Sequence, residues 1–183
     1  MIRVHLVRHG RAAAGWDVDP DPGLDELGVR QAAEAAATLA GGSPARLLSS
    51  PLRRCRETAA PLAEWWGVDV EVEPRVAEIP SPEGVPMAER VDWLRAAMGG
   101  TWSDLGPRYT TFRDGIVDAV SSLAAPTVVF SHFVAINAVI GAAIGDDRLV
   151  IRSLDNASIT VVEVVDGRIR LVSGGREADT LIR

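Results

Sequence analysis

Apolar and polar positions alternate at the start of the chain, where Ile2, Val4 and Leu6 are separated by single polar residues. Val7 then joins the apolar run, so the pattern predicts a buried strand that opens the chain. Three later segments have strand-like patterns: ARLLSS at 45–50, VDVEVEP at 68–74 and PTVVFSH at 126–132. Strict alternation in the second is typical of a strand near a sheet edge. The continuous apolar run of the third is typical of a central parallel strand.

Helical spacing of apolar residues follows a loop rich in glycine, proline and aspartate. It predicts a helix over 24–40, which the segment GGSP at 41–44 ends. A second helix is expected to begin at Pro51 with Ser50 as its N-cap, and Pro61 is expected to bend or split it. Further elements are predicted at these positions: helices over 86–98, 107–123 and 134–145, and a hairpin over 158–174 that turns at Asp166–Gly167.

Strands and helices therefore alternate over most of the chain. This order predicts an α/β fold, a three-layer sandwich in which helices cover both faces of a mainly parallel sheet. The chain has 183 residues, enough for one domain with a sizeable core. No internal repeat or low-complexity tract interrupts the sequence, so residues 1–183 are expected to form a single domain.

Composition and charge narrow the function classes. A formal net charge of −6 argues against a general binder of nucleic acid or anionic membrane, because both reward a basic surface. The N-terminus has no signal-peptide pattern, and no stretch approaches the roughly 18 apolar residues of a membrane span, so a cytoplasmic protein is expected. Cys55 is the single cysteine, which excludes an internal disulfide and a cysteine-based zinc site.

Two of the three histidines, His5 and His9, lie in the opening segment. At this spacing on a helix they could share a metal ion, but four residues of strand span about 13 Å, which is too far. His5 is therefore expected to be a packed or hydrogen-bonded structural residue. His9 lies where the strand ends before Gly10, and ligands of open α/β sheets bind beyond the carboxyl ends of the strands. His9 is therefore a candidate for chemistry.

His132 stands in the same position at the end of the apolar strand 126–131. Parallel strands bring their carboxyl ends to one edge of the sheet, so His9 and His132 can meet there. The segment LLSSPLRRCRETA at 47–59 also passes from a strand into a helix, and it carries three arginines. Histidines, arginines and two helix N-termini at one edge predict an anion site, with phosphate as the candidate. The alternative, arginines on a solvated face and two structural histidines, explains each feature but not their common location.

Five segments resemble, in this order, those of the histidine phosphatase superfamily, the phosphoglycerate-mutase-like proteins: LVRHG at 6–10, LDELGVRQA at 24–32, SSPLRRCRETA at 49–59, AEI at 77–79 and VFSH at 129–132. The resemblance covers residues 2 to about 163. RHG alone is a weak match, but its combination with SSPL-x-R-x-x-x-T-A and SH in this order and spacing is specific.

The resemblance implies a role for each matching position. His9 matches the family's nucleophile, Arg8 its phosphate-binding partner and Arg54 its second phosphate arginine. His132 matches the second active-site histidine, and Glu78 the acidic residue that donates a proton to the leaving group. Arg53 and Arg56 are expected on the outer face of their helix.

These roles also agree with the chemistry of the residue types. A neutral imidazole is a competent nucleophile, and Arg8, Arg54 and a protonated His132 can hold the oxygens of a phosphoryl group. The leaving group needs a proton, so Glu78 is expected to have a raised pKa. The arginines neutralise the phosphate charge, so neither a metal nor a cofactor is expected.

The sequence departs from the family pattern at several positions. Glu83 competes with Glu78 for the acid role, because the glycine-rich segment that follows is poorly preserved. Arg11 and Ala12 follow RHG where many members have a polar residue and then a small hydroxyl residue, and Phe133 stands where glycine is usual. The short chain leaves little room for the insertions of a mutase, so a phosphatase is favoured.

The sequence therefore predicts a metal-independent phosphatase that hydrolyses phosphomonoesters of a small molecule through a phosphohistidine on His9. The alternatives are a protein-phosphohistidine phosphatase and a catalytically silent phosphate-binding module. Substrate specificity is expected to reside in the loop 80–107. The candidates for an apolar binding surface there are Trp93, Trp102, Tyr109 and Phe133.

Overall fold

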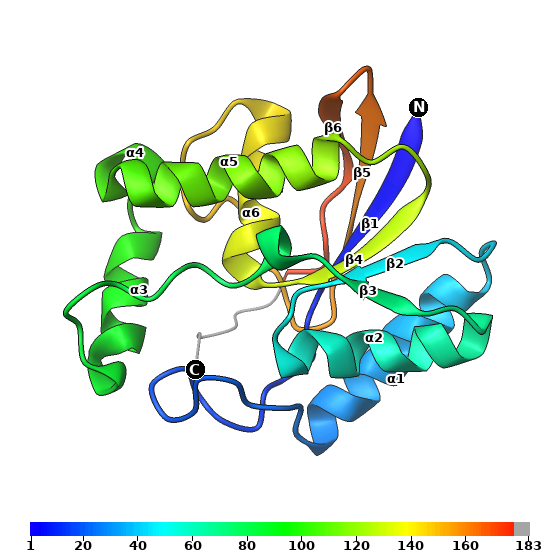
Figure 1. Cartoon of the computed structure of the whole chain (residues 1–183), viewed down its shortest axis with the longest axis horizontal. Coiled ribbons are helices and arrows are strands. Elements are labelled where there is room, and N and C mark those ends of the chain that lie inside the picture. The colour runs from blue at the N-terminus through cyan, green and yellow to red at the C-terminus, as the bar shows by residue number, and fades with distance from the viewer. Residues whose placement is uncertain (178–183) are drawn as a thin grey trace.

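The opening strand forms as β1 (Ile2–Arg8), inside a six-stranded sheet with the order β3–β2–β4–β1–β5–β6 (Figure 1). The structure is a computed structural model that describes residues 1–177. The remaining strands are β2 (Arg46–Ser49), β3 (Val70–Val72), β4 (Thr127–Ser131), β5 (Ile159–Val165) and β6 (Arg168–Ser173). Strands β1 to β4 pair in parallel, whereas β5 and β6 form an antiparallel hairpin beside β1. The sheet is thus mainly parallel, with β3 at its edge, as the sequence predicted.

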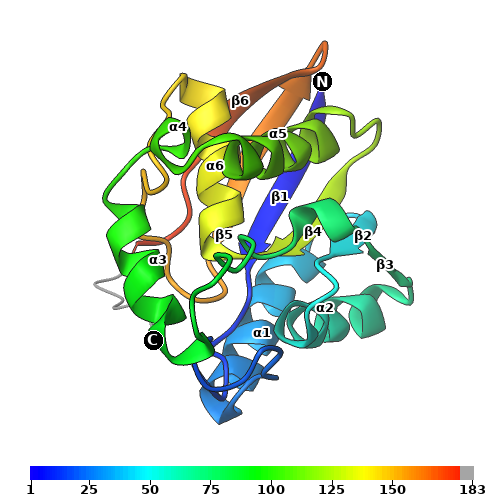
Figure 2. The same cartoon turned by 60° about the vertical axis from the view of Figure 1, so that its left-hand side comes forward.

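Helices cover both faces of this sheet and complete the predicted three-layer α/β sandwich (Figures 1 and 2). They are α1 (Glu26–Ala40), α2 (Arg53–Trp66), α3 (Arg90–Met98), α4 (Trp102–Leu105), α5 (Pro107–Ser121) and α6 (Phe133–Ile144). Two 3-10 turns, Pro74–Val76 and Met87–Glu89, lie between them. Within residues 1–177, no helix combines the length and apolarity that crossing a membrane requires.

The strands pack on both sides, and this explains their continuous apolar runs. In β1, Val4 and Leu6 belong to the core that the sheet shares with α5 and α6, whereas Val7 belongs to the core under α1 and α2. In β2, Leu48 likewise belongs to the core shared with α5 and α6, and Leu47 belongs to the core under α1 and α2. Because successive side chains of a strand point to opposite faces, a strand covered on both sides has no polar face.

Two details of α2 differ from the prediction. The helix begins at Arg53, and its N-cap is Leu52, whose side chain has no acceptor. The hydroxyl of Ser50 accepts from the Leu52 N–H at 3.2 Å and also lies 2.8 Å from His132 Nε2. Pro61 lies within the helix without dividing it. The sequence also missed α4, a single turn held by a capping box of Thr101 and Asp104.

The predicted hairpin turn is present between β5 and β6. Asp166 and Gly167 have φ values of 49° and 74°. Both central residues are thus in the left-handed region that tight hairpin turns require, and aspartate and glycine tolerate it best.

Candidate active site

Strands β1 and β4 bring His9 and His132 together at the carboxyl edge of the sheet. Arg8 is the register partner of Ser131, and the backbone N–H of His9 donates to the carbonyl of Ser131 at 3.0 Å. The two imidazole rings lie 5.3 Å apart between centroids, at an interplanar angle of 62°. Parallel pairing therefore joins two segments that are 123 positions apart in the sequence.

His9 is held with Nε2 as its unprotonated ring nitrogen. Its Nδ1 lies 2.7 Å from the carbonyl oxygen of Gly10, and since a carbonyl only accepts, Nδ1 carries the proton. The lone pair is then on Nε2. Burial, reinforced by Arg54, His132 and Arg8, lowers the pKa of His9 well below 6.5, so the ring is neutral at pH 7. A neutral imidazole with a free Nε2 is the form that can act as a nucleophile.

Arg54 lies at the centre of the site and is 5% exposed. Its Nε lies 3.3 Å from His9 Nε2, and its second terminal nitrogen lies 3.3 Å from both Glu78 and His132 Nδ1. The position of Arg54 is fixed by α2, whose first turn begins where β2 reaches the same edge. One guanidinium thus faces all three ionisable groups that the sequence singled out.

Arg8 supplies a second buried cation. One of its terminal nitrogens donates to the carbonyl of Leu154 at 2.5 Å, and its guanidinium lies 5.0 Å from the centre of the Phe133 ring. Burial lowers its pKa to about 10, against the attraction of Glu78 and Asp155, so it remains charged at pH 7. The Nε of Arg8 is buried and has no hydrogen-bond partner among residues 1–177.

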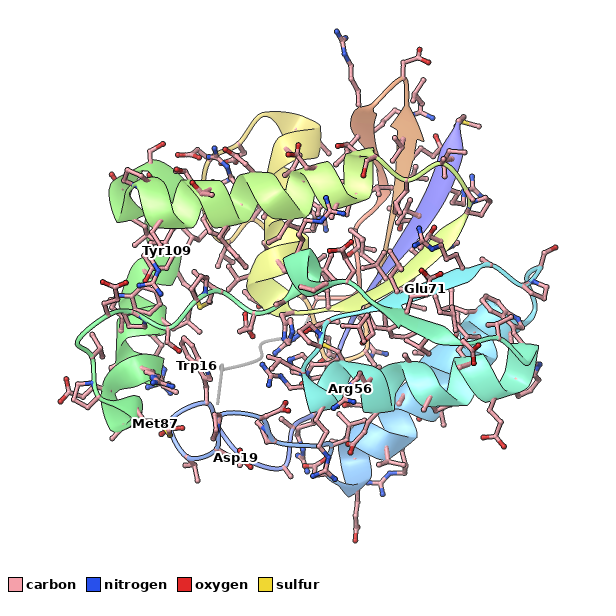
Figure 3. The ribbon with its side chains drawn as sticks, in the orientation of Figure 1. Trp16, Asp19, Arg56, Glu71, Met87 and Tyr109 are labelled. Atoms are coloured by element: carbon pink, nitrogen blue, oxygen red, sulfur yellow. The ribbon has the colours of Figure 1, made fainter. Side chains whose placement is uncertain are left out.

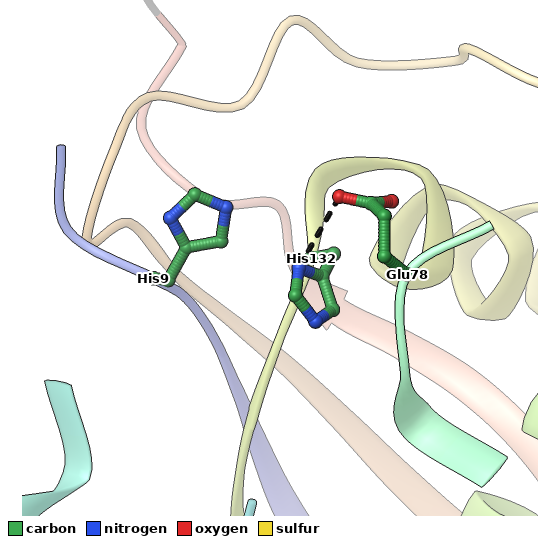
Figure 4. A group of neighbouring side chains, drawn as sticks. All are labelled: His9, Glu78 and His132. Atoms are coloured by element: carbon green, nitrogen blue, oxygen red, sulfur yellow. Dashed lines mark ion pairs between the residues drawn. The ribbon is translucent and has the colours of Figure 1, made fainter. Parts of the chain in front are cut away.

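Glu78 and His132 form a pair beside these arginines (Figure 4). His132 Nδ1 lies 3.2 Å from the Glu78 carboxylate, and His132 Nε2 lies 2.8 Å from the hydroxyl of Ser50. Burial disfavours the charged carboxylate, but the hydrogen bond with His132 and the charge of Arg54 outweigh it and hold the pKa of Glu78 well below its usual range. The expectation of a raised pKa is thus wrong for the ligand-free protein, because the cations that bind a phosphate also stabilise the carboxylate.

Two glycines of the sequence motifs allow the backbone to pass close to the site. A Cβ on Gly10 would lie 2.5 Å from the carbonyl oxygen of Gly28, and one on Gly28 would lie 2.1 Å from that of Arg11. The N–H of Gly10 donates to the hydroxyl of Thr58, which donates in turn to the carbonyl of Arg54. This chain of contacts ties the loop after His9 to the helix that carries Arg54.

Several candidate residues lie outside this cluster. The side chain of Glu83 is 87% exposed and pairs with Arg108 at 2.9 Å, so the structure places Glu78, and not Glu83, beside the histidines. Arg56 is exposed on α2 (Figure 3), and Arg53 forms an ion pair with Glu57 on the same face. His5 is half-buried within β1, where burial and then Arg3 lower its pKa.

A narrow cleft opens above His9, and its walls differ from the prediction. Phe133 lines it as expected, but Trp102 is buried in the core and Trp93 packs against Tyr109 with ring centres 5.5 Å apart. Trp16, from the loop between β1 and α1, lines the cleft instead (Figure 3). Sequence reasoning missed Trp16 because a loop residue has no periodicity that points it toward a site.

The same three side chains could in principle hold a metal ion. The donor atoms of His9, Glu78 and His132 all lie within 4.8 Å of one another. Within residues 1–177, these three form the one cluster of histidine, cysteine and carboxylate side chains close enough to share a metal ion. Arg54, however, lies within 3.3 Å of each of them, so its charge would oppose a cation there. The charge distribution favours an anion.

A mixed three-layer α/β fold with two histidines and two buried arginines at its carboxyl edge defines a phosphoryl-transferring class of protein. The chain belongs to the histidine phosphatase superfamily (branch 1), whose family model matches residues 4–176. This confirms the resemblance that the sequence motifs carried.

Individual relatives extend the comparison. The chain is 30% identical to a 2,3-bisphosphoglycerate-dependent phosphoglycerate mutase of Thermoplasma acidophilum, over 90% of this chain and 88% of the mutase. It is 31% identical to a bifunctional protein of Mycobacterium tuberculosis, over 93% of this chain but 53% of that longer protein. Its fold is similar to that of a mycobacterial glucosyl-3-phosphoglycerate phosphatase in complex with VO3, with a TM-score of 0.71, 26% identity, and coverage of 94% of this chain and 98% of that one.

Proposed function

We propose that the protein is a metal-independent phosphatase that hydrolyses phosphomonoesters of small molecules through a phosphohistidine on His9. The observation that carries the proposal is the unprotonated Nε2 of His9, which accepts from Arg54 Nε at 3.3 Å in the ligand-free protein and can turn its lone pair to a phosphorus bound there. A phosphoryl group bound to Arg8 and Arg54 would have its phosphorus next to this lone pair. Electrostatic stabilisation of the phosphoryl oxygens is then supplied by fixed donors, which need no reorganisation during the reaction.

In the first step, His9 Nε2 attacks phosphorus while the bond between phosphorus and the ester oxygen breaks. The leaving alkoxide takes a proton from Glu78, which contacts a terminal nitrogen of Arg54 next to the Nε that faces His9. His132 donates its Nδ1–H to Glu78 and is held in that tautomer by the hydroxyl of Ser50. The products are the free alcohol and an enzyme phosphorylated on His9.

Glu78 must acquire its proton when the substrate binds, because its pKa in the free enzyme is low. A phosphate dianion at Arg8 and Arg54 neutralises the charges that hold the carboxyl ionised, and it repels the carboxylate directly. Both effects raise the pKa of Glu78 in the complex. The proton for the leaving group is thus taken up with the substrate.

In the second step, water attacks the phosphorus from the side that the alcohol has left. Glu78, now ionised, accepts the proton of the water, the bond between Nε2 and phosphorus breaks, and inorganic phosphate is released. His9 regains its free Nε2 and needs no further proton. The cycle consumes one water molecule and uses only side chains of this chain.

Several observations support this reading over the alternatives. His9 is 8% exposed at the bottom of a cleft, which favours a small ester over a phosphohistidine on a folded protein surface. The nucleophile, both arginines and the acid occur together, which favours turnover over silent binding. The names of two relatives include phosphoglycerate and glucosyl-3-phosphoglycerate, and these names describe those proteins and do not identify the substrate of this chain.

The direct test is release of inorganic phosphate from 4-nitrophenyl phosphate and from a panel of sugar phosphates, nucleotides, phosphoamino acids and phosphohistidine. The wild-type protein should hydrolyse at least one ester, and His9→Ala should abolish hydrolysis without loss of the folded state. Arg53→Ala, on the exposed face of the same helix as Arg54, is the matched control and should retain activity. Wild-type turnover in His9→Ala would refute the proposal.

A further inference from the structure

The cleft above His9 has a strongly asymmetric lining. Its polar side chains are Arg8, His9, Arg54 and Glu78, all of which the proposed reaction uses. The other residues that line it are apolar, and the large ones are Trp16, Leu94, Phe133 and Val134. Beyond the reacting groups, the indole N–H of Trp16 is the one side-chain hydrogen-bond donor that residues 1–177 bring to this cleft, and they bring no further acceptor.

The in-line geometry of phosphoryl transfer places the leaving group on this apolar side. The ester oxygen must lie opposite His9 across the phosphorus and next to the acid that protonates it. Glu78 lines the same cleft as Leu94, Phe133 and Val134. The alcohol part of the ester therefore occupies the space between Glu78 and the apolar walls.

A second groove adjoins His9 on its other side, but it does not suit the leaving group. It contains Arg11, Asp25 and Gln31 and lacks Glu78. Part of its polar surface is engaged within the protein: Arg11 donates from Nε to Asp25 at 2.5 Å and from its backbone N–H to Gln31 at 2.8 Å. Because this groove lacks the acid, it cannot protonate a leaving group, and it would accommodate other parts of a substrate.

The apolar walls are held in place by specific contacts. The loop that carries Trp16 is closed at its base by the backbone bond from Ala13 to Gly23. It is tied to α2 by the bonds from the Arg53 N–H to Asp21 and from the Leu24 N–H to Glu57. Trp16 also packs against the core. A preorganised aromatic wall loses little entropy when an apolar group binds to it.

Phe133 is held in place by its position in α6 and by its contact with Arg8. It is the first residue of α6, it is buried, and its ring lies 5.0 Å from the guanidinium of Arg8. The phosphate arginine and the apolar wall thus support each other, and the phenyl ring brings apolar surface to the position next to the phosphate. A glycine at 133 would leave that space to water.

We propose, on the basis of the proposed function, that the preferred substrates are phosphomonoesters of apolar alcohols with a compact aryl or alkyl group. Polyhydroxylated leaving groups such as sugars and glycerate are disfavoured, because most of their polar groups would lose water without gaining a partner. Arg90 lies 6.0 Å from the Trp16 ring and is not among the residues that line the cleft.

The test compares kcat/KM for 3-phenylpropyl phosphate, glycerol 3-phosphate and 3-phosphoglycerate, with 4-nitrophenyl phosphate as the reference ester. For the wild-type protein, kcat/KM for the phenylpropyl ester should exceed that for each polar ester by about 50-fold, because binding moves one phenyl-sized group out of water. Trp16→Ala should lower the phenylpropyl value about 10-fold and leave the glycerol value unchanged. Trp16→Leu keeps apolar bulk and should retain most of the preference. Trp65→Ala removes an exposed tryptophan of α2 and is the matched control.

The outcomes separate this proposal from the one it rests on. One outcome is that the protein hydrolyses 4-nitrophenyl phosphate, but its kcat/KM for glycerol 3-phosphate or 3-phosphoglycerate equals or exceeds that for 3-phenylpropyl phosphate. This result would overturn the apolar leaving-group site and leave the proposed phosphatase activity intact. An unchanged preference in folded Trp16→Ala, monitored by circular dichroism, would also overturn it. Failure to hydrolyse any ester, 4-nitrophenyl phosphate included, would overturn the phosphatase itself and this assignment with it.

Discussion

Replacing Arg54 by alanine removes the one cation that contacts every reacting group. The side chain presents two donors to the site: Nε toward His9 Nε2, and a terminal nitrogen toward Glu78 and His132, all at 3.3 Å. Loss of one preorganised donor typically costs 10²–10³ in rate. Because two charged donors are lost here, we expect kcat/KM for 4-nitrophenyl phosphate to fall by about 10³-fold or more, which corresponds to about 4 kcal/mol of transition-state stabilisation.

The same substitution has a second consequence in the pH profile. After burial, Arg54 is the largest cause of the lowered pKa of His9. Without Arg54 the pKa of His9 rises toward 6.5, so His9 becomes protonated at a higher pH. The acid limb of the kcat/KM profile, which reports the free enzyme, should therefore move to higher pH in Arg54→Ala.

A pair of further variants separates charge from geometry. Arg54→Lys keeps the positive charge but not the planar pair of donors, so the acid limb should stay near that of the wild type while kcat/KM still falls by about 10- to 100-fold. Arg53→Ala should have little effect on either quantity, since Arg53 is exposed and pairs with Glu57. A greater loss in Arg53→Ala than in Arg54→Ala, or an unshifted acid limb in Arg54→Ala, would refute the reasoning.

Three other predictions use different measurements. Glu78→Gln should strongly reduce hydrolysis of alkyl phosphates but spare the first step with 4-nitrophenyl phosphate, whose leaving group needs no proton. The side chain of Glu83 is exposed, so Glu83→Gln should behave like the wild type. The reverse pattern would assign the acid role to Glu83. EDTA should leave phosphate release unchanged, and loss of activity restored by zinc or magnesium would revive a metal at the histidines. Gly10→Ala should lower the free energy of unfolding by about 1–3 kcal/mol in urea denaturation, because its Cβ would meet the carbonyl of Gly28. Gly41→Ala, with open space around its Cβ, is the control for that measurement, and an equal loss there would contradict the close-approach argument.

Much of the fold follows from local patterns in the sequence. The alternation in β1 and the apolar run of β4 predict buried strands, and parallel pairing then carries His9 and His132 to one edge. The start of α2 was misplaced because serine is a common N-cap residue, and the sequence does not show that the Ser50 hydroxyl serves both the Leu52 N–H and His132. Local propensity cannot anticipate a side chain recruited by a residue 82 positions away.

The site was predictable in its membership but not in its electrostatics. Motif spacing brings Glu78 into consideration, but its ionisation depends on Arg54 and His132, whose distances only the folded chain defines. The cleft walls were the least predictable part. Trp16 lies in an irregular loop whose path depends on bonds to α2, whereas Trp102 has the same residue type and is buried in the core.

The most direct test of the central claim is to identify the phosphorylated residue during turnover. Glu78→Gln, incubated with radiolabelled substrate and quenched in alkali, should accumulate an acid-labile and base-stable phosphoryl group, because the water in the second step lacks its base. Peptide mapping by mass spectrometry should place that group on His9, and phosphorus NMR should assign it to Nε2. A phosphoryl group on His132, or turnover of 4-nitrophenyl phosphate with no phosphorylated histidine at any time, would contradict the account.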